Sequence, residues 1–342
     1  MSAHLADPEV SERTEKTDRI ELIRALGAIA LTPPPSSDRL CEAVGLASIA
    51  PADHTEAFVL LLPPHAAIYL GPDGQLGGEG LDRVEGFWRA LGLRPPADAD
   101  HLGVLLMAYA DLLEQTAPFA ERVDASAELS NGLRMAPTEA RTDPAARAAA
   151  TVFHEHLWPF APGYLVALSR LGLPEVSAWA DLVLALLRDE RHRHPAPPSL
   201  PLALREAPGP IEVGIGFDDL LDAVVTPVRI GMVLTQRDLA AGAAEVGLGY
   251  RRGERRYALK AMVEQDKPAT LSWLARLAHR AAGRDMAHTG AAGGDETERW
   301  WTRRATHSAD VLDTLAAQAE TSREPSEHRL APHDPAPHDA AR

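Results

Sequence analysis

The chain has 342 residues and a formal net charge of −15, from 49 acidic and 34 basic side chains. This length allows one large domain or two, with a sizeable buried core. A general nucleic-acid binder must neutralise phosphates with clustered Lys and Arg, so the acidic balance argues against that class. Alanine and leucine dominate and aromatic residues make up only 5% of the chain, which favours helices over strands.

Cys41 is the single cysteine, which excludes an intramolecular disulfide and any multi-cysteine zinc or iron–sulfur site within one chain. We expect it to be a small buried hydrophobic residue. The N-terminal stretch is acidic and lacks a basic segment followed by an apolar one, so we expect no secretory signal. No apolar run approaches the roughly 18–20 residues that span a bilayer. These features predict a cytoplasmic protein without membrane insertion.

The N-terminal part of the chain predicts helices separated by proline-rich and glycine-rich segments. Apolar residues at spacings of three predict a first helix over about 17–30, which three consecutive prolines then end. The apolar run 58–62 is followed by two prolines, and we expect an extended buried segment there. The other helices expected in this part lie over about 37–48, 81–91 and 102–113.

The rest of the chain carries recognisable helix signals. Asp143-Pro144 is typical of an N-cap followed by the first helical residue. That helix is interrupted near Trp158-Pro159, Pro174 begins another, and residues 190–210 form a linker. Thr235 to Asp238 resembles a capping box. Further helices are expected over about 217–225, 235–246, 254–265 and 268–282.

Beyond residue 284 the composition changes to Gly, His, Asp, Pro and Ala. We therefore expect one multi-helix domain over 16–283 and a flexible low-complexity tail over 284–342. Within the tail, an amphipathic helix at 296–319 is a candidate, and the last twenty residues are expected to be disordered.

The most informative pattern lies over 63–103. Pro63-Pro64-His65-Ala66-Ala67-Ile68-Tyr69-Leu70 leads through Gly77-Gly78-Glu79 and an amphipathic helix to Ala99-Asp100-His101-Leu102-Gly103. In this order and spacing the chain resembles the TorD/DmsD/NarJ family of cytoplasmic chaperones for molybdenum-cofactor oxidoreductases. The resemblance covers roughly 15–280 and is strongest over 63–113 and 227–265.

The resemblance implies an all-α chaperone domain that is not an enzyme and needs no cofactor. The implied partner is the catalytic subunit of a molybdopterin-dependent oxidoreductase, bound through its signal peptide or its immature body until cofactor insertion and assembly or export. Some branches of the family bind twin-arginine signals and others do not. The chain would act as a monomer or a homodimer.

The resemblance also implies a peptide-binding region. Large side chains would form a groove for an apolar segment, and carboxylates would bind the partner's arginines through charge-assisted hydrogen bonds. The expected site residues are Tyr69, Leu70, Gly77, Gly78, Glu79, Trp88, Asp98, Asp100 and His101.

Several of these residues also have a structural interpretation, and the sequence leaves both open. Tyr69 could belong to the hydrophobic core instead of lining a groove. Asp100 could cap a helix that begins at His101. Trp88 is in phase with the apolar face of its helix, as a core residue would be. Gly77-Gly78 could simply allow a turn, and Glu79 could favour a helix N-terminus. Where family members often have Glu-Pro before the Asp-His pair, this chain has Asp98-Ala99.

The strongest alternative is a helical DNA-binding transcriptional regulator. Residues 235–256 could form a helix-turn-helix whose basic reading residues are Arg251, Arg252, Arg255 and Arg256. Interspersed glutamates and the acidic balance argue against it. An enzyme acting on a small molecule is a third possibility, but neither a nucleophile–base pattern nor a metal-ligand spacing is present. His154 and His156 are two apart and would point away from each other on a helix.

Overall fold

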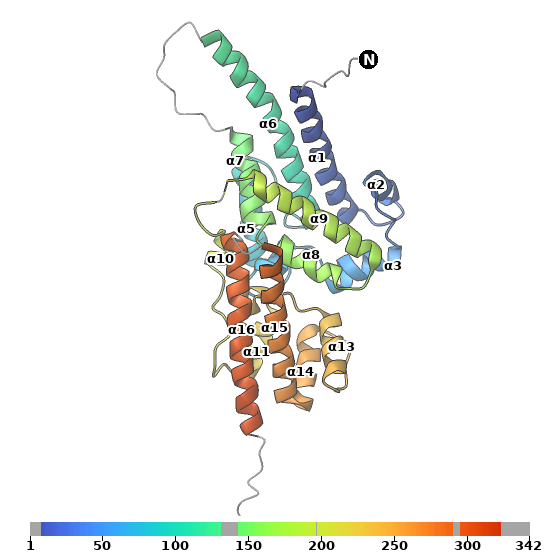
Figure 1. Ribbon diagram of the computed structural model, residues 1–342, viewed down its shortest axis with the longest axis vertical. Coiled ribbons are helices and arrows are strands. Elements are labelled where there is room, and N and C mark those ends of the chain that lie inside the picture. Colours follow the sequence, from blue (N-terminus) through green and yellow to red (C-terminus); the bar gives the residue numbers. More distant parts are fainter. Residues whose placement is uncertain (1–7, 131–142, 196, 290–294, 323–342) are drawn as a thin grey trace, which may run out of the picture.

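The structure is a computed structural model that describes residues 8–130, 143–195, 197–289 and 295–322 (Figure 1). In these residues the regular secondary structure is helical and no β-strand is present, which confirms the all-α prediction. Within the described part of the chain, one isolated antiparallel bridge joins His65 and His101. None of the helices in the described ranges is long and apolar enough to cross a membrane.

The N-terminal part is built around two long helices that lie side by side, α1 and α6 (Figure 1). Between them the chain folds into short helices and a π-helical segment, η1. The elements are α1 (Pro8–Leu31), α2 (Asp38–Ala43), α3 (Pro51–His54), η1 (Thr55–Leu61), α4 (Ala66–Leu70), α5 (Gly78–Ala90) and α6 (Leu102–Ser130).

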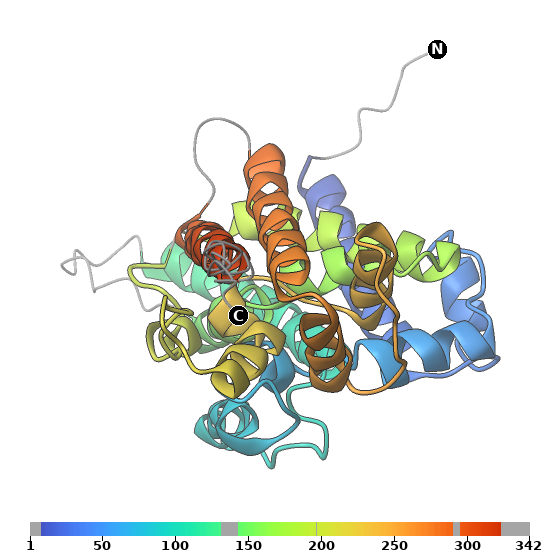
Figure 2. The same cartoon turned by 90° about the horizontal axis from the view of Figure 1, so that it is seen from below.

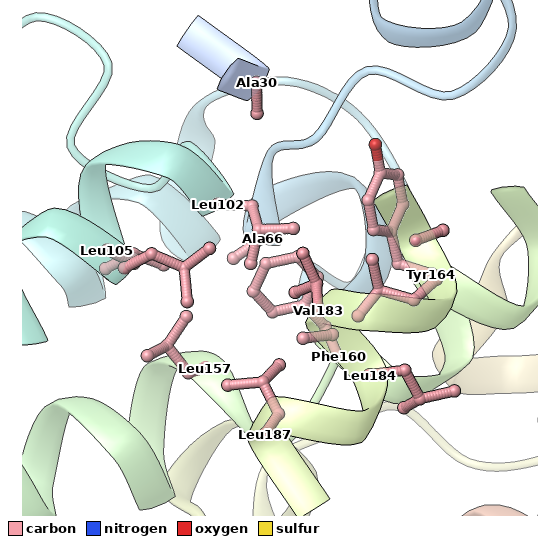
Figure 3. Packing of buried hydrophobic residues seen from close by; sticks show 14 of the residues in the cluster. Ala30, Ala66, Leu102, Leu105, Leu157, Phe160, Tyr164, Val183, Leu184 and Leu187 are labelled. Atoms are coloured by element: carbon pink, nitrogen blue, oxygen red, sulfur yellow. The ribbon is translucent and has the colours of Figure 1, made fainter. Parts of the chain in front are cut away.

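The middle of the chain closes the first hydrophobic core. Asp143 accepts a hydrogen bond from the Ala145 N–H at 2.9 Å, so the expected N-cap is confirmed. The interruption near Trp158-Pro159 is also confirmed, because the helix restarts only at Ala161. The elements here are α7 (Pro144–Thr151), π-helical η2 (Val152–Leu157), α8 (Ala161–Ser169) and α9 (Pro174–Arg193). In Figure 3 their apolar side chains meet those that begin α6, including Leu102 and Leu105.

The C-terminal helices form a second hydrophobic core. In both Figure 1 and Figure 2, α15 and α16 lie alongside each other. Capping boxes begin α13 at Thr235 and α16 at Asp295, so the expectation for Thr235 is confirmed. The elements are α11 (Phe217–Val225), α12 (Pro227–Ile230), α13 (Gln236–Glu245), α14 (Arg255–Gln265), α15 (Lys267–Thr289) and α16 (Glu296–Thr321). The short helix α10 (Leu202–Arg205), which precedes them, packs into the first core.

The amphipathic helix considered at 296–319 is present as α16, and it is part of the packed body. The Trp301 indole donates to the Pro159 carbonyl at 2.8 Å, and Asp295 accepts from both Trp158 and Arg191 at 2.6 Å. Leu312 is completely buried in the second core. The twenty residues expected to be disordered, 323–342, lie outside the described residues, and a boundary at 283 remains a prediction.

The prediction of an extended segment over 58–62 was wrong. Residues Thr55–Leu61 are π-helical, and the Leu62 N–H continues that pattern by bonding the Ala57 carbonyl at 3.0 Å. Pro63 and Pro64 follow this helix and therefore remove none of the N–H groups that it uses. The prolines mark where the helix ends but do not prevent it from forming. As a result Val59 and Leu60 are exposed, at 59% and 67%.

Candidate functional site

The candidate site forms where the segment that precedes α4 lies against the segment that precedes α6. His65 and Asp100, which are 35 residues apart in the sequence, are neighbours there. The Ala66 N–H donates to the Asp100 carbonyl at 3.0 Å, and the Leu102 N–H donates to the Pro64 carbonyl at 2.7 Å. These bonds flank the bridge between His65 and His101. The Asp-His pair therefore fastens the start of α4 to the start of α6.

The carboxylate of Asp100 is engaged on both oxygens. Oδ1 lies 3.1 Å from His65 Nδ1, and Oδ2 accepts the Ala67 N–H at 2.9 Å. Asp100 is 3% exposed and satisfies one of the free N–H groups at the beginning of α4. The interpretation that it caps the helix after His101 was wrong, because the Gly103 N–H instead bonds His101 Nδ1 at 3.0 Å.

The titration of the pair follows from this geometry. Burial would raise the pKa of the Asp100 carboxyl, but hydrogen bonds from His65 and the Ala67 N–H outweigh it and hold that pKa below its ordinary value. Burial, aided by the neighbouring His65, lowers the pKa of His101 to about 4. His101 is therefore neutral at pH 7, as its role as a hydrogen-bond acceptor at Nδ1 requires.

Tyr69 and Leu70 lie on α4 and are buried, at 2% and 6% exposure. The Tyr69 hydroxyl donates to the Pro63 carbonyl at 2.9 Å, and its ring stacks on Phe160 with centroids 5.8 Å apart. Both side chains belong to the first core. The edge of Tyr69 also reaches an apolar pocket between the two cores.

The beginning of α5 presents the exposed members of the predicted site. Gly77 and Gly78 have positive φ angles of 79° and 60°, a conformation that favours glycine. Glu79 follows, with its side chain 61% exposed and 2.7 Å from Arg83. A Cβ at Gly80 would lie 2.8 Å from the Ala67 Cα, so α5 packs closely on α4 and holds Glu79 beside the Asp100 crossing.

Asp98 and Trp88 complete the predicted set. Asp98 is exposed in the loop before α6, and its backbone carbonyl accepts the His101 N–H at 3.0 Å. Trp88 is half-buried and packs against the first core, and its indole Nε1 is buried without a hydrogen-bond partner. The contacts of Trp88 favour the core interpretation of this residue.

The structure thus separates the predicted residues into two groups. Tyr69, Leu70, Asp100 and His101 are buried and engaged within the chain, and the accessible charge is carried by Glu79 and Asp98. Sequence reasoning missed His65, the partner of Asp100. The sequence feature that could have indicated His65 was its position directly after two prolines and before the first residue of a short helix.

The described residues contain no group of three or more His, Cys, Asp or Glu side chains arranged to hold a metal ion. His154 and His156 are both buried. The ring of His154 contacts Phe153 and His194, and the ring of His156 contacts Phe87. Burial lowers the pKa of His156 to about 4. Cys41 is a free, completely buried thiol, as expected, and burial raises its pKa.

Two of the four arginines that the DNA-binding alternative requires form hydrogen bonds or ion pairs with other residues of the chain. Arg255 donates to the Leu234 carbonyl at 2.9 Å, and burial lowers its pKa. Arg256 bonds Asp218 at 3.0 Å and also pairs with Asp222. These contacts hold α14 against neighbouring elements, which leaves Arg251 and Arg252 as the exposed cations of this region.

Taken together, the described residues define an all-helical protein with a tightly fastened Asp-His junction beside exposed carboxylates. Residues 47–165 match the family model described as nitrate reductase delta subunit. This segment contains every residue of the predicted site, and its match confirms the resemblance to the TorD/DmsD/NarJ family. No curated protein and no solved structure matches the chain.

Proposed function

We propose that the chain is a maturation chaperone for the catalytic subunit of a molybdopterin-dependent oxidoreductase. It binds the signal peptide or the cofactor-free body of that subunit and delays assembly or export until the cofactor is inserted. It acts in the cytoplasm, as a monomer or homodimer, and contributes no redox chemistry of its own.

The observation that carries this proposal is the match of residues 47–165 to the nitrate reductase delta subunit family. The name of that family refers to a reductase, and its members serve the maturation of molybdenum enzymes. The matched segment includes α4, α5 and the start of α6, which are the elements around the Asp-His junction.

The geometry supports a division of labour within the proposed peptide-binding region. The buried residues Tyr69, Leu70, Asp100 and His101 fix the positions of α4 and α6. Glu79 and Asp98 are exposed, and in this proposal their carboxylates meet basic residues of the partner. Gly77 and Gly78 allow the partner's backbone to approach, and Trp88 supports α5 from the core side.

A chaperone that must release its client needs only modest affinity. A Kd of about 1 μM corresponds to about −8 kcal/mol. Hydrogen bonds between charged groups contribute about 1.5–3 kcal/mol each when well formed. Two such contacts and one buried apolar side chain together contribute about 4.5–9 kcal/mol before ordering costs are subtracted, so further apolar contacts with the client are needed to reach this affinity.

The test is co-purification of the tagged chain with a co-expressed, cofactor-free oxidoreductase subunit, with the bound protein identified by mass spectrometry. We expect Glu79→Lys combined with Asp98→Lys to reduce client recovery at least tenfold. Glu264→Lys is the matched control, because Glu264 is 60% exposed and also belongs to an i,i+4 ion pair, but lies on α14. Equal recovery with all variants would remove Glu79 and Asp98 from the site.

The DNA-binding alternative makes a different prediction. A gel-shift assay at physiological salt would show a retarded duplex if the exposed Arg251 and Arg252 read DNA. Because Arg255 and Arg256 are already bonded within the protein, we expect no retardation.

A further inference from the structure

An apolar pocket lies between the first and second cores, outside the Asp-His junction. It is formed by the turn after η2, the first turns of α8, the segment that follows α12, the middle of α15 and the first turns of α16. Trp158, Phe160 and Trp301 give it an aromatic lining, and Val166, Met232 and Leu277 add aliphatic surface. The Glu298 carboxylate also lines the pocket, and it accepts the Asp295 N–H of the capping box at 3.3 Å.

Two arginines stand at this pocket with hydrogen-bonding capacity left over. Arg170 bonds the Val233 carbonyl and Asp238, both at 3.3 Å, while its buried Nε has no partner. Arg188 on α9 is half-buried and also lines the pocket. Across the described residues, its guanidinium has no hydrogen-bond or ion-pair partner, whereas most arginines of this acidic protein are paired.

A pocket of this composition selects its ligand by two features. Apolar and aromatic walls favour an apolar side chain that leaves water. A guanidinium without a partner beside such walls favours a carboxylate, because the charge-assisted bond replaces lost hydration. We propose that this pocket binds a peptide segment of a partner protein in which an apolar side chain stands next to a carboxylate.

The proposed ligand is opposite in charge to the basic segment expected at Glu79 and Asp98. One partner could therefore contact the chain at two places, with a basic segment at α5 and an acidic-apolar segment at the pocket. The pocket proposal does not depend on the chaperone function, because it follows from the lining residues and the arginines alone.

The direct probe is a fluorescein-labelled heptapeptide, Gly-Ser-Phe-Asp-Leu-Gly-Ser, titrated with the full chain and followed by fluorescence anisotropy. A second peptide carries Lys in place of Asp. We expect the acidic peptide to bind at least tenfold more tightly than the basic one. We also expect Arg188→Glu to weaken binding of the acidic peptide at least tenfold, since the unpaired cation is then replaced by an anion.

Blocking the pocket gives a second, independent variant. Gly163 lines the pocket on α8, and a Cβ there would meet no atom within 4 Å. Gly163→Trp should therefore fold and fill the pocket, abolishing peptide binding. Gly86→Trp is the matched control: Gly86 is also helical with an open Cβ position, but it lies on α5 away from the pocket. Circular dichroism verifies that both variants are folded.

Three results would overturn the proposal. One is equal binding of the acidic and basic peptides, and another is unchanged binding by folded Gly163→Trp. The third concerns the occupant: if a chain ending at Ser322 binds the acidic peptide more than tenfold better than the full chain, the pocket serves the chain's own C-terminal segment and not a partner. These outcomes are separate from client co-purification, which tests the chaperone function.

Discussion

Asp100 uses both carboxylate oxygens within the chain, and its bonds help to join the start of α4 to the start of α6. Its partners are the His65 ring and the Ala67 N–H. A carboxylate in such a position stabilises the folded state at any pH at which it is ionised. Since its pKa is held below the ordinary value in the folded state, that stabilisation is present above the unfolded pKa and is lost as the pH falls through the folded one.

Replacing Asp100 by Ala should lower the stability of the protein substantially. The change leaves the buried Ala67 N–H without a partner, which costs about 1–3 kcal/mol, and removes the bond to His65 as well. We expect a loss of about 2–4 kcal/mol in the free energy of unfolding, measured by urea denaturation at pH 7.

Asp98→Ala is the control for this change, because its carboxylate is exposed two residues away. It should alter stability by less than about 0.5 kcal/mol. If Asp100→Ala were as stable as Asp98→Ala, the Asp100 carboxylate would not fasten the two helices.

At this scale the sequence predicted part of the site. Asp100 and His101 stand out locally, and an Asp before a helix is a familiar cap. Which helix is capped could not be predicted, because Asp100 bonds a residue 33 positions earlier in the chain. Only the fold brings the N-terminus of α4 to it. Burial of Tyr69 was likewise undecided, since an apolar run lines a core or a groove equally well.

At the scale of the elements, α1 and α6 lie in close contact at two glycines, Gly27 and Gly103. A Cβ on Gly103 would lie 2.5 Å from the Gly27 carbonyl oxygen and 2.7 Å from Leu31 Cγ. A Cβ on Gly27 would lie 2.8 Å from the Gly103 carbonyl oxygen. These two positions therefore set the distance between α1 and α6, the helix that begins at the Asp-His junction.

Gly103→Ala should separate α1 from α6 and destabilise the protein by about 1–3 kcal/mol, as overpacking in a core does. Thermal unfolding followed by circular dichroism measures the change. Gly86→Ala is the control, since its Cβ would meet nothing within 4 Å, and a helical Gly→Ala change there should stabilise by up to about 1 kcal/mol. A stabilising effect at both positions would contradict the close approach.

Element boundaries were predictable where a side chain marks them. Asp143, Thr235 and Pro174 begin helices as expected, because caps and first-turn prolines act within a few residues of themselves. The run 58–62 carries no such mark. Its continuous apolar character is compatible with a helix, a strand or an extended segment. In the structure Phe58 of this segment packs against His54 and Trp179, and Trp179 is more than 100 residues away in the sequence.

At the scale of the whole molecule, two hydrophobic cores share a boundary that α16 crosses. Its first turns contact the first core through Trp300, and its later turns contribute Ala309, Val311 and Leu312 to the second. The compositional change at residue 284 suggested a flexible tail. Composition alone could not show that one amphipathic segment of this tail, α16, packs against α15 and completes the second core. The packing of α16 favours a folded body that extends to Thr321.

Removing residues 284–342 should expose the apolar face of α15 that α16 covers and destabilise the second core. We expect aggregation or a lowered melting temperature for the chain ending at 283. A chain ending at Ser322 keeps α16 and should stay within about 0.5 kcal/mol of the full chain. Full stability of the chain ending at 283 would instead support a domain limited to 16–283.

The central claim is that the family-matched segment binds an immature oxidoreductase subunit. Isothermal titration of the purified chain with a cofactor-free molybdopterin oxidoreductase subunit and with its cofactor-loaded form tests this most directly. The account predicts a Kd of about 1 μM for the cofactor-free form, at least tenfold weaker binding of the loaded form, and weakening as salt rises, because exposed ion pairs are screened. Equal affinity for both forms, or no binding to either, would contradict it.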